Sequence, residues 1–551
     1  MNQSSKMSYR PTTMAPNGMI TTPHYLASQA GLKVLQEGGN AVEAAIAASA
    51  TISVVYPHMN GIGGDNFWLV YHAKTQELKA LNSSGRSGQQ ASISFYRSQG
   101  YTKIPTRGAM AANTVPGAVA GWEKAFQYSQ NQMGGTFSWD VLLRSAIHYA
   151  KDGFPVTPSQ EYWTNANLDS ADDEFRHLQR FSEFQKIFLK SNGLSYQAGE
   201  QMNQPDLALS LEAIASKGSS YFYRGELAKS IVQDLQNHGG LLTYQDFKDH
   251  HSDWVDPLSI RYRGYRVYNT PPNSQGFASL SILNILNHFD LSYIEEGSAD
   301  YYHLLTEATK LAFYDRDHYL TDPEFSPIPI DELLSVQRGM ELASRIDFTR
   351  GTHVQKQLDP KGDTIWLGVV DQEGNAVSMI QSIYHEFGSG FIPKNTGILL
   401  QNRGSFFSLD ENHVNSLQPK KRTYHTLNPA MLFKNDKLYL VYGTMGGEGQ
   451  PQTQAALVTR IIDYDFPVQA AIEAPRWLYG RTWGASSNSL KLEGRISDDV
   501  ISTLQRRGHE VEVLDDFTDI MGHAGAIKID ENTGVKFGGA DPRGDGAAIG
   551  Y

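Results

Sequence analysis

Thr364 has the most distinctive chemical potential in the chain, because it stands in Gly362-Asp363-Thr364 at the start of a strand-like run. If the bond between Asp363 and Thr364 were cut, the threonine would carry a nucleophile and a base in one residue. Its new α-amine, with a pKa of about 7.7–8.0, could accept the hydroxyl proton near neutral pH. The triplet alone does not establish this chemistry, since a threonine that opens a strand is common.

A glycine loop and the histidines offer two other kinds of chemistry. The loop 61–66, Gly-Ile-Gly-Gly-Asp-Asn, lies between a helical and a strand-like segment and could hold a phosphate. The dinucleotide fingerprint runs from strand to helix, the reverse order, so a turn is favoured. The 17 histidines include no HExxH motif and no zinc-like spacing, and we expect His24, His58 and His425 to be packed or hydrogen-bonded. We therefore predict no metal and no cofactor.

The segments around Thr364 predict a β-hairpin, with strands at 365–370 and 376–383 joined by a turn at 371–375. Two helices are expected before the glycine loop, at 25–37 and 42–55, and the second is apolar almost all round, as a buried helix is. A strand at 67–71 follows the loop. The pattern from about 120 to 345 is mostly helical, with strand signals near 259–268. Further elements are expected as strands at 437–442, 488–492, 511–514 and 525–529 and as helices near 451–463 and 497–507.

Composition restricts the class of protein. The 551 residues are 40% hydrophobic and 19% charged, with a net charge of −12 and no long basic run, so nucleic acid is not an expected partner. The chain has no cysteine, which excludes disulfides, thiolate nucleophiles and cysteine metal sites. The first twenty residues lack an apolar signal segment, and the longest apolar stretch, about 44–56, is too short to span a bilayer. We expect a cytoplasmic protein with no membrane partner.

Several motifs, in a fixed order, together resemble the γ-glutamyltranspeptidase family of N-terminal-nucleophile hydrolases, from about Gly18 to Tyr551. They are Gly38-Gly-Asn-Ala-Val-Glu-Ala-Ala45 with Pro57-His58 and Gly61-Ile-Gly-Gly64, the run from Gly362 to Ser378 with Phe387-Gly-Ser-Gly390, Gly443-Thr-Met-Gly-Gly447, and Asp541-Pro-Arg543 with the final Gly-Tyr. Within the family, the chain is similar to the oxamate amidohydrolase branch. The resemblance implies an αββα sandwich and a precursor that cuts itself before Thr364. A large subunit of residues 1–363, helix-rich and binding the substrate carboxylate, would pair with a small catalytic subunit of residues 364–551.

The resemblance also implies roles for individual residues. Thr364 matches the nucleophile, and Asp363 is the residue released by autocleavage. Gly446 and Gly447 match the glycines whose N–H groups hold the oxyanion, each donor contributing about 3–4 kcal/mol. Ser382 matches a second hydroxyl that supports the nucleophile.

Arg86 matches the arginine that grips the substrate's carboxylate, a task suited to its bidentate guanidinium. Without the resemblance, the arginine would be expected to be a surface charge, Ser382 a strand hydroxyl and Gly446-Gly447 a turn.

Three departures from the family's pattern concern the substrate pocket. Phe406 stands where γ-glutamyl enzymes have an acid for the substrate's α-ammonium, Tyr384 replaces an asparagine, and His425-Thr426 replaces a serine pair. Loss of the partner of a desolvated ammonium typically costs about 2–5 kcal/mol, which disfavours a glutathione enzyme. The segment 408–429 is short, so we expect no lid over the site and easier access for water, which favours hydrolysis over transfer.

These observations favour an autoprocessing amidohydrolase that acts on a small carboxylate amide such as oxamate. One alternative is a glutathione hydrolase or γ-glutamyltransferase that uses another ammonium partner, Glu386 or Asp410. Others are a cephalosporin-acylase-like enzyme and a non-catalytic binding relative. The expected partners are the substrate and the two subunits of one precursor, and a dimer of such pairs is left open.

Overall fold

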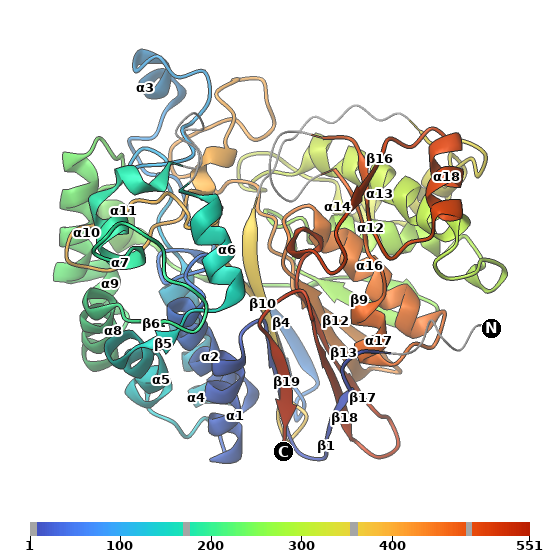
Figure 1. Cartoon of the computed structure of the whole chain (residues 1–551), viewed down its shortest axis with the longest axis horizontal. Coiled ribbons are helices and arrows are strands. Elements are labelled where there is room, and N and C mark those ends of the chain that lie inside the picture. Colours follow the sequence, from blue (N-terminus) through green and yellow to red (C-terminus); the bar gives the residue numbers. More distant parts are fainter. Residues whose placement is uncertain (1–7, 169–176, 353–361, 481–486) are drawn as a thin grey trace.

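Two stacked seven-stranded antiparallel sheets form the centre of the protein (Figure 1). The computed structural model describes residues 8–168, 177–352, 362–480 and 487–551. Sheet A has the order β1 (Thr13–Ala15), β18 (Lys536–Ala540), β17 (Ala524–Ile529), β13 (Lys437–Thr444), β12 (Ala430–Lys434), β9 (Tyr265–Asn269) and β8 (Leu258–Tyr262). Sheet B has the order β19 (Ala547–Gly550), β2 (Met19–Thr22), β10 (Asp363–Val370), β11 (Ala376–Tyr384), β3 (Asp65–His72), β4 (Glu77–Asn82) and β7 (Asp253–Val255).

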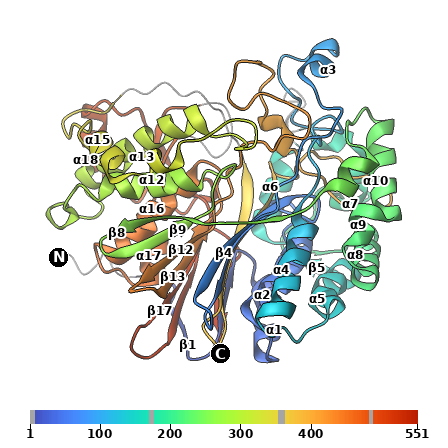
Figure 2. The same ribbon diagram turned by 180° about the vertical axis from the view of Figure 1, so that it is seen from behind.

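A layer of helices covers the outer face of each sheet, which makes four layers (Figures 1 and 2). The helices on the side of sheet B are α1 (Tyr25–Gln36), α2 (Ala41–Val55), α4 (Ala118–Gln132), α5 (Trp139–Asp152) and α8 (Pro205–Lys217). Those on the side of sheet A are α12 (Gly276–Leu286), α13 (Ala299–Tyr319), α16 (Gly449–Ile462), α17 (Val468–Glu473) and α18 (Asp498–Arg506). The predicted αββα sandwich is confirmed.

Shorter elements lie around these layers. The helices are α3 (Ile93–Ser98), α6 (Pro158–Ala166), α7 (Ser182–Phe188), α9 (Ser220–Arg224), α10 (Glu226–Asn237), α11 (Tyr244–Asp249), α14 (Ile330–Leu333) and α15 (Val336–Ala343). The strands are β5 (Phe154–Pro155) with β6 (Gln201–Met202), and β14 (Trp477–Tyr479), β15 (Leu490–Glu493) and β16 (Val511–Leu514). None of the described helices combines the length and apolar character of a bilayer-spanning segment.

Side chains of β10 alternate between two apolar cores, as the period of a strand requires. Ile365, Leu367 and Val369 belong to the core between sheet B and its helices, whereas Trp366 and Val370 belong to the core between the two sheets. The strand is therefore covered on both faces, so the start of β10 lies inside the molecule.

The predicted hairpin and the predicted buried helix are both present. The turn after β10 is closed by Asp371, whose carboxylate accepts the backbone N–H of Asn375 at 2.8 Å. Helix α2 begins with a capping box of Asn40 and Glu43, and all of its residues are buried. The other expected helices and strands match described elements within a few residues.

Candidate active site

Thr364 lies at an irregularity between the two central strands of sheet B. Asp363 pairs with Tyr384 and Ile365 pairs with Gln381, so the register shifts at Thr364 and places it opposite the Ser382–Ile383 step of β11. Such bulges bend a strand and redirect its side chains. Thr364 is fully buried, and the side chain of Asp363 lies outside the described part of the structure.

The Gly446-Gly447 loop connects β13 to α16 and lies directly against the residue before Asp363. Both glycines have positive φ angles, 115° and 50°, which side chains disfavour. A Cβ on Gly447 would lie 3.3 Å from the carbonyl oxygen of Gly362. The loop therefore approaches the Gly362–Thr364 segment closely, at the N-terminal end of α16, where backbone N–H groups favour negative charge.

Five of the predicted site residues are linked through one residue that the sequence analysis did not single out, Arg403. The guanidinium of Arg403 donates to the Ser382 hydroxyl and, through its other terminal nitrogen, to the Thr426 hydroxyl, both at 3.3 Å. It lies 4.3 Å from the ring centre of Tyr384 and 5.3 Å from that of Phe406. The positive charge of Arg403 also lowers the pKa of His425, which is next to Thr426. We call these six residues the Arg403 cluster.

The aromatic members of the cluster stack on one another. The rings of Tyr384 and Phe406 lie 4.3 Å apart at an angle of 28°, and Phe406 also contacts Tyr424 at 4.9 Å. A Cβ on Gly362 would come 3.0 Å from the Tyr384 ring, so this ring also borders the predicted cleavage segment. The position at which the sequence predicts a missing acid is thus aromatic, with a guanidinium beside it.

Asp65 and His425 form a buried pair next to Arg403. Nε2 of His425 lies 3.3 Å from a carboxyl oxygen of Asp65, whose other oxygen accepts the N–H groups of Gly85 and Gly117. Burial raises the pKa of Asp65 to about 7, although the positive charge of Arg403 and the hydrogen bonds oppose this. Burial, and then the charge of Arg403, hold the pKa of His425 well below its usual range. The imidazole is therefore neutral, and Nδ1 remains as an acceptor with no hydrogen-bond partner among the described residues.

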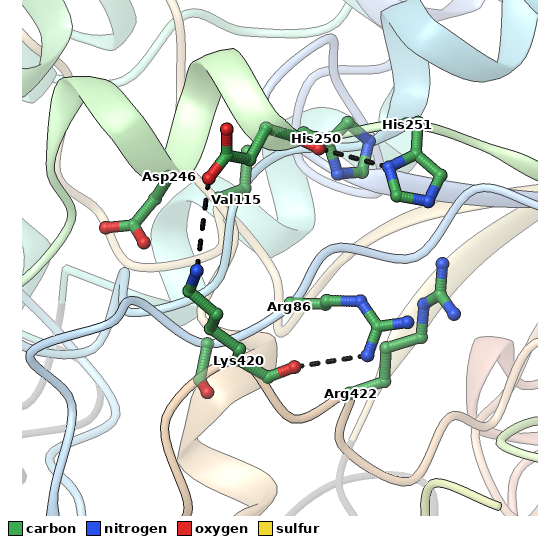
Figure 3. Close-up of a pocket in the computed structure, with 9 residues that line it drawn as sticks. Arg86, Val115, Asp246, His250, His251, Lys420 and Arg422 are labelled. Atoms are coloured by element: carbon green, nitrogen blue, oxygen red, sulfur yellow. Dashed lines mark hydrogen bonds and ion pairs between the residues drawn. The ribbon is translucent and has the colours of Figure 1, made fainter. Parts of the chain in front are cut away.

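Arg86 lies outside the Arg403 cluster, in a surface pocket with Arg422 and Lys420 (Figure 3). Its guanidinium is paired with Glu324 at 2.5 Å and Asp322 at 3.4 Å, and it donates to the carbonyl oxygen of Lys420 at 3.1 Å. The prediction that Arg86 holds the substrate's carboxylate stays a prediction, and these acidic partners weigh against it.

A buried polar network supports the loop that carries Gly447. The side-chain nitrogen of Gln275 donates to the carbonyl oxygens of Thr426 and Gly447, at 2.8 and 2.9 Å. Its side-chain oxygen accepts from Arg316 at 3.2 Å, and Arg316 is ion-paired with Glu448 at 2.7 Å. Gln275 therefore joins two segments of the site and is held by a buried ion pair.

The glycine loop 61–66 has a packing role. A Cβ on Gly63 would come 2.2 Å from the carbonyl oxygen of Leu399, and one on Gly64 would come 2.1 Å from that of Ser382. Only glycine permits the loop to approach these backbones so closely. The loop thus supports β11 and places Asp65 in the site, in keeping with the expected turn.

Among the described residues, one group has metal-ligating geometry: His303, Glu307 and His509, all buried. His303 and His509 hydrogen-bond each other at 2.8 Å, and Glu307 is ion-paired with Lys310 at 2.8 Å. This group has no signature in the sequence, because His509 lies about 200 positions after His303 and Glu307. Because the Lys310 ammonium already neutralises Glu307, these three residues do not indicate a bound metal. That the protein binds no metal stays a prediction.

Comparisons with known proteins agree with the geometry. A sequence model of the family described as Gamma-glutamyltranspeptidase matches residues 27–551. The chain belongs to the γ-glutamyltranspeptidase family. It is thereby an enzyme of the N-terminal-nucleophile hydrolase class, as the sequence predicted, and such a nucleophile is typical of the family.

Family members with several different names are similar to the chain over nearly its whole length. The glutathione hydrolase-like YwrD proenzyme of Bacillus subtilis is 49% identical over 97% of this chain and 98% of its own. The oxamate amidohydrolase proenzyme of Klebsiella pneumoniae is 45% identical over 98% and 99%. The crystal structure of cephalosporin acylase from Bacillus halodurans has a TM-score of 0.88 at 38% identity, covering 99% of this chain and 98% of that one. These similarities agree on the family, but the names of the three relatives refer to different substrates.

Proposed function

We propose that the protein is an autoprocessing amidohydrolase that hydrolyses the amide of a small carboxylate such as oxamate, with Thr364 as its N-terminal nucleophile. The observation that carries the proposal is the placement of buried Thr364 between Ser382 on the adjacent strand and the Gly446-Gly447 loop against Gly362. The similarity to an oxamate amidohydrolase proenzyme supports the substrate class.

Maturation would begin with attack of the Thr364 hydroxyl on the carbonyl carbon of Asp363. The peptide C–N bond breaks as the ester forms, and the nitrogen becomes the free amine of Thr364. Water then hydrolyses the ester, which releases the Asp363 carboxylate and restores the hydroxyl. The products are a large chain of 363 residues and a small chain of 188 residues.

Turnover would use the same hydroxyl on the substrate's amide carbon. The free amine of Thr364 accepts the hydroxyl proton and passes it to the leaving nitrogen, so ammonia departs and an acyl ester remains. Backbone N–H groups of Gly446 and Gly447 would hold the negative charge that develops on the carbonyl oxygen. Water then hydrolyses the ester, and oxamate would yield oxalate and ammonia.

A γ-glutamyl activity is the second candidate, because the YwrD relative is named glutathione hydrolase-like. The Arg403 cluster disfavours it, since Phe406 and a guanidinium border the place where a substrate ammonium would need an acid. Of the two alternative acids, Asp410 is exposed and Glu386 is buried. A cephalosporin-acylase-like activity on glutaryl amides would also use a carboxylate and differs by the length of the acyl group.

Two measurements test the proposal. Ammonia release from oxamate is compared with the cleavage of a γ-glutamyl anilide and a glutaryl anilide, and we expect the highest kcat/KM with oxamate. A denaturing gel should show two fragments for the wild type, and one uncut band near 61 kDa with no activity for Thr364→Ala. Faster turnover of either anilide would refute the substrate class, and cleavage of the Thr364→Ala chain would refute the nucleophile.

A further inference from the structure

Arg403 differs from the other fully buried arginines in forming no ion pair with an acid in the described part of the chain. Arg316, Arg460 and Arg476 are each ion-paired, with Glu448, Glu296 and Asp541 respectively. Among the described residues, no carboxylate forms an ion pair with Arg403, although its exposure is only 1%. A buried charge without a partner of opposite sign is costly, so proteins rarely retain one without a reason.

Among the described residues, hydroxyls and an aromatic ring contact the guanidinium of Arg403 directly, and no carboxylate does. Two neutral hydroxyls, those of Ser382 and Thr426, accept from its terminal nitrogens at 3.3 Å, and the Tyr384 ring provides a cation–π contact. Its Nε has no hydrogen-bond partner among the described residues. Asp65 is the nearby acid and interacts with Arg403 through its charge, but its hydrogen-bond partners are Gly85, Gly117 and His425.

We propose that Arg403 is the anion site of the active centre and binds the carboxylate of the substrate. The guanidinium offers a planar set of donors that matches a carboxylate, and the bound anion would supply the missing negative charge. The unpartnered Nδ1 of His425, beside Thr426, can accept an N–H from the same ligand. This inference rests on the proposed function, and it moves the carboxylate contact from Arg86 to Arg403.

The position of Arg403 favours a substrate whose carboxylate lies close to its amide carbon. Arg403 contacts Ser382, and Ser382 lies on β11 across from Thr364 on β10. The Cα atoms of such paired strands are typically about 5 Å apart, so a carboxylate held by Arg403 would lie near the nucleophile. This geometry fits an acid whose amide carbon is bonded directly to the carboxylate, or separated from it by a few atoms. Oxamate is of the first kind.

The test measures binding of oxalate, the product expected from oxamate, to the autocleaved enzyme by calorimetry. Arg403→Met removes the charge at similar length, and Arg86→Met is the matched control at the other candidate arginine. We expect oxalate affinity to fall at least about thirtyfold in Arg403→Met, as for loss of one partner of a buried charge pair, and to change less than about threefold in Arg86→Met. Oxamide, which has no charge, serves as the comparison ligand and should bind both variants as it binds the wild type.

The outcomes separate the anion site from the proposed function. Three results would overturn the inference. They are equal oxalate binding by wild type and Arg403→Met, loss of binding only in Arg86→Met, and no oxalate binding by the wild type. Oxalate binding that depends on Arg403, without ammonia release from oxamate, would refute the proposed substrate and support the anion site. If Arg403→Met is insoluble, Arg403→Lys decides, because it keeps the charge but loses the planar fork. We expect this variant to bind oxalate about tenfold more weakly, and unchanged binding would overturn the inference.

Discussion

The side-chain nitrogen of Gln275 donates a hydrogen bond of 2.9 Å to the carbonyl oxygen of Gly447. The same nitrogen holds Thr426, and Arg316 fixes the other end of the amide. Gln275 lies before the predicted cut and both bonded carbonyls lie after it. One residue of the large subunit would therefore set the distance between the oxyanion loop and the substrate pocket of the small subunit.

Replacing Gln275 with alanine is expected to slow both autocleavage and turnover. The Gly447 carbonyl would lose its partner, the loop would shift, and misplacement of an oxyanion donor commonly lowers kcat by about ten- to a hundredfold. KM for oxamate should change less than kcat. Gln469→Ala is the control, because Gln469 is an equally buried amide that bonds the Ala540 carbonyl at 2.9 Å, away from the site. Equal losses of kcat in both variants would show only general destabilisation.

Replacing Ser382 with alanine should impair the site at two points. Its hydroxyl accepts the Tyr384 N–H at 2.7 Å and a guanidinium N–H of Arg403 at 3.3 Å, so both donors would lose a buried acceptor. We expect slower autocleavage, a kcat about tenfold lower and weaker oxalate binding. Ser382→Thr keeps the hydroxyl and should retain most of the autocleavage, the kcat and the oxalate binding. Gel densitometry follows autocleavage, and ammonia release follows turnover. An alanine variant with wild-type kinetics would remove Ser382 from the mechanism.

Replacing Phe406 with aspartate tests the charge balance of the site. The new carboxylate would lie beside Arg403, whose guanidinium is 5.3 Å from the Phe406 ring centre, and would pair with it. We expect oxalate affinity to fall about thirtyfold, and turnover of a γ-glutamyl anilide to rise relative to oxamate. Phe406→Leu removes the ring without adding charge and should retain most of the oxalate affinity. Unchanged oxalate binding by the aspartate variant would contradict the anion site at Arg403.

Asp65 should make stability depend on pH. Its pKa is about 7 in the fold against 3.8 in the unfolded chain, so the folded state keeps a proton that the unfolded state releases. This contribution is fully present below pH 4 and is lost as pH rises through 7, by up to about 4 kcal/mol in the free energy of unfolding. The free energy of unfolding, measured from melting curves between pH 4 and 8, should therefore fall more steeply with rising pH in the wild type than in Asp65→Asn. If the stability of both proteins changed equally with pH, Asp65 would not titrate between pH 4 and 8.

The sequence predicted the parts of the fold that have strong local patterns. Helix α2 is apolar almost all round and the β10–β11 hairpin has a clear turn, so each could be located without knowledge of its neighbours. Thr364 could be proposed as the nucleophile, and the glycine loop as part of the site, because family motifs surround them.

The charges of the site could not be predicted in the same way. Whether an arginine is paired depends on residues far away in sequence: Arg86 meets Asp322 and Glu324, more than 230 positions later, whereas Arg403 meets hydroxyls and rings. The missing acid at Phe406 is visible in the sequence, whereas the surroundings of Arg403, three residues earlier, form only in the folded chain. Gln275 was likewise not predictable, because its partners become neighbours only in the folded chain.

The strand order implies that the two products of the proposed cut would share both sheets. Strands from before and after position 364 alternate in sheet B, as β19, β2, β10–β11 and β3, and meet again in sheet A at β1·β18 and β9·β12. The two products would thus be held by ladders of main-chain hydrogen bonds, and their separation would require unfolding both sheets. Once cut and unfolded, the protein could refold only if two separate chains met. Its lifetime in the folded state would therefore depend on the unfolding rate rather than on a reversible equilibrium. Heating the cut enzyme should consequently be a one-way process at dilute concentration, while the uncut chain keeps both halves within reach of each other.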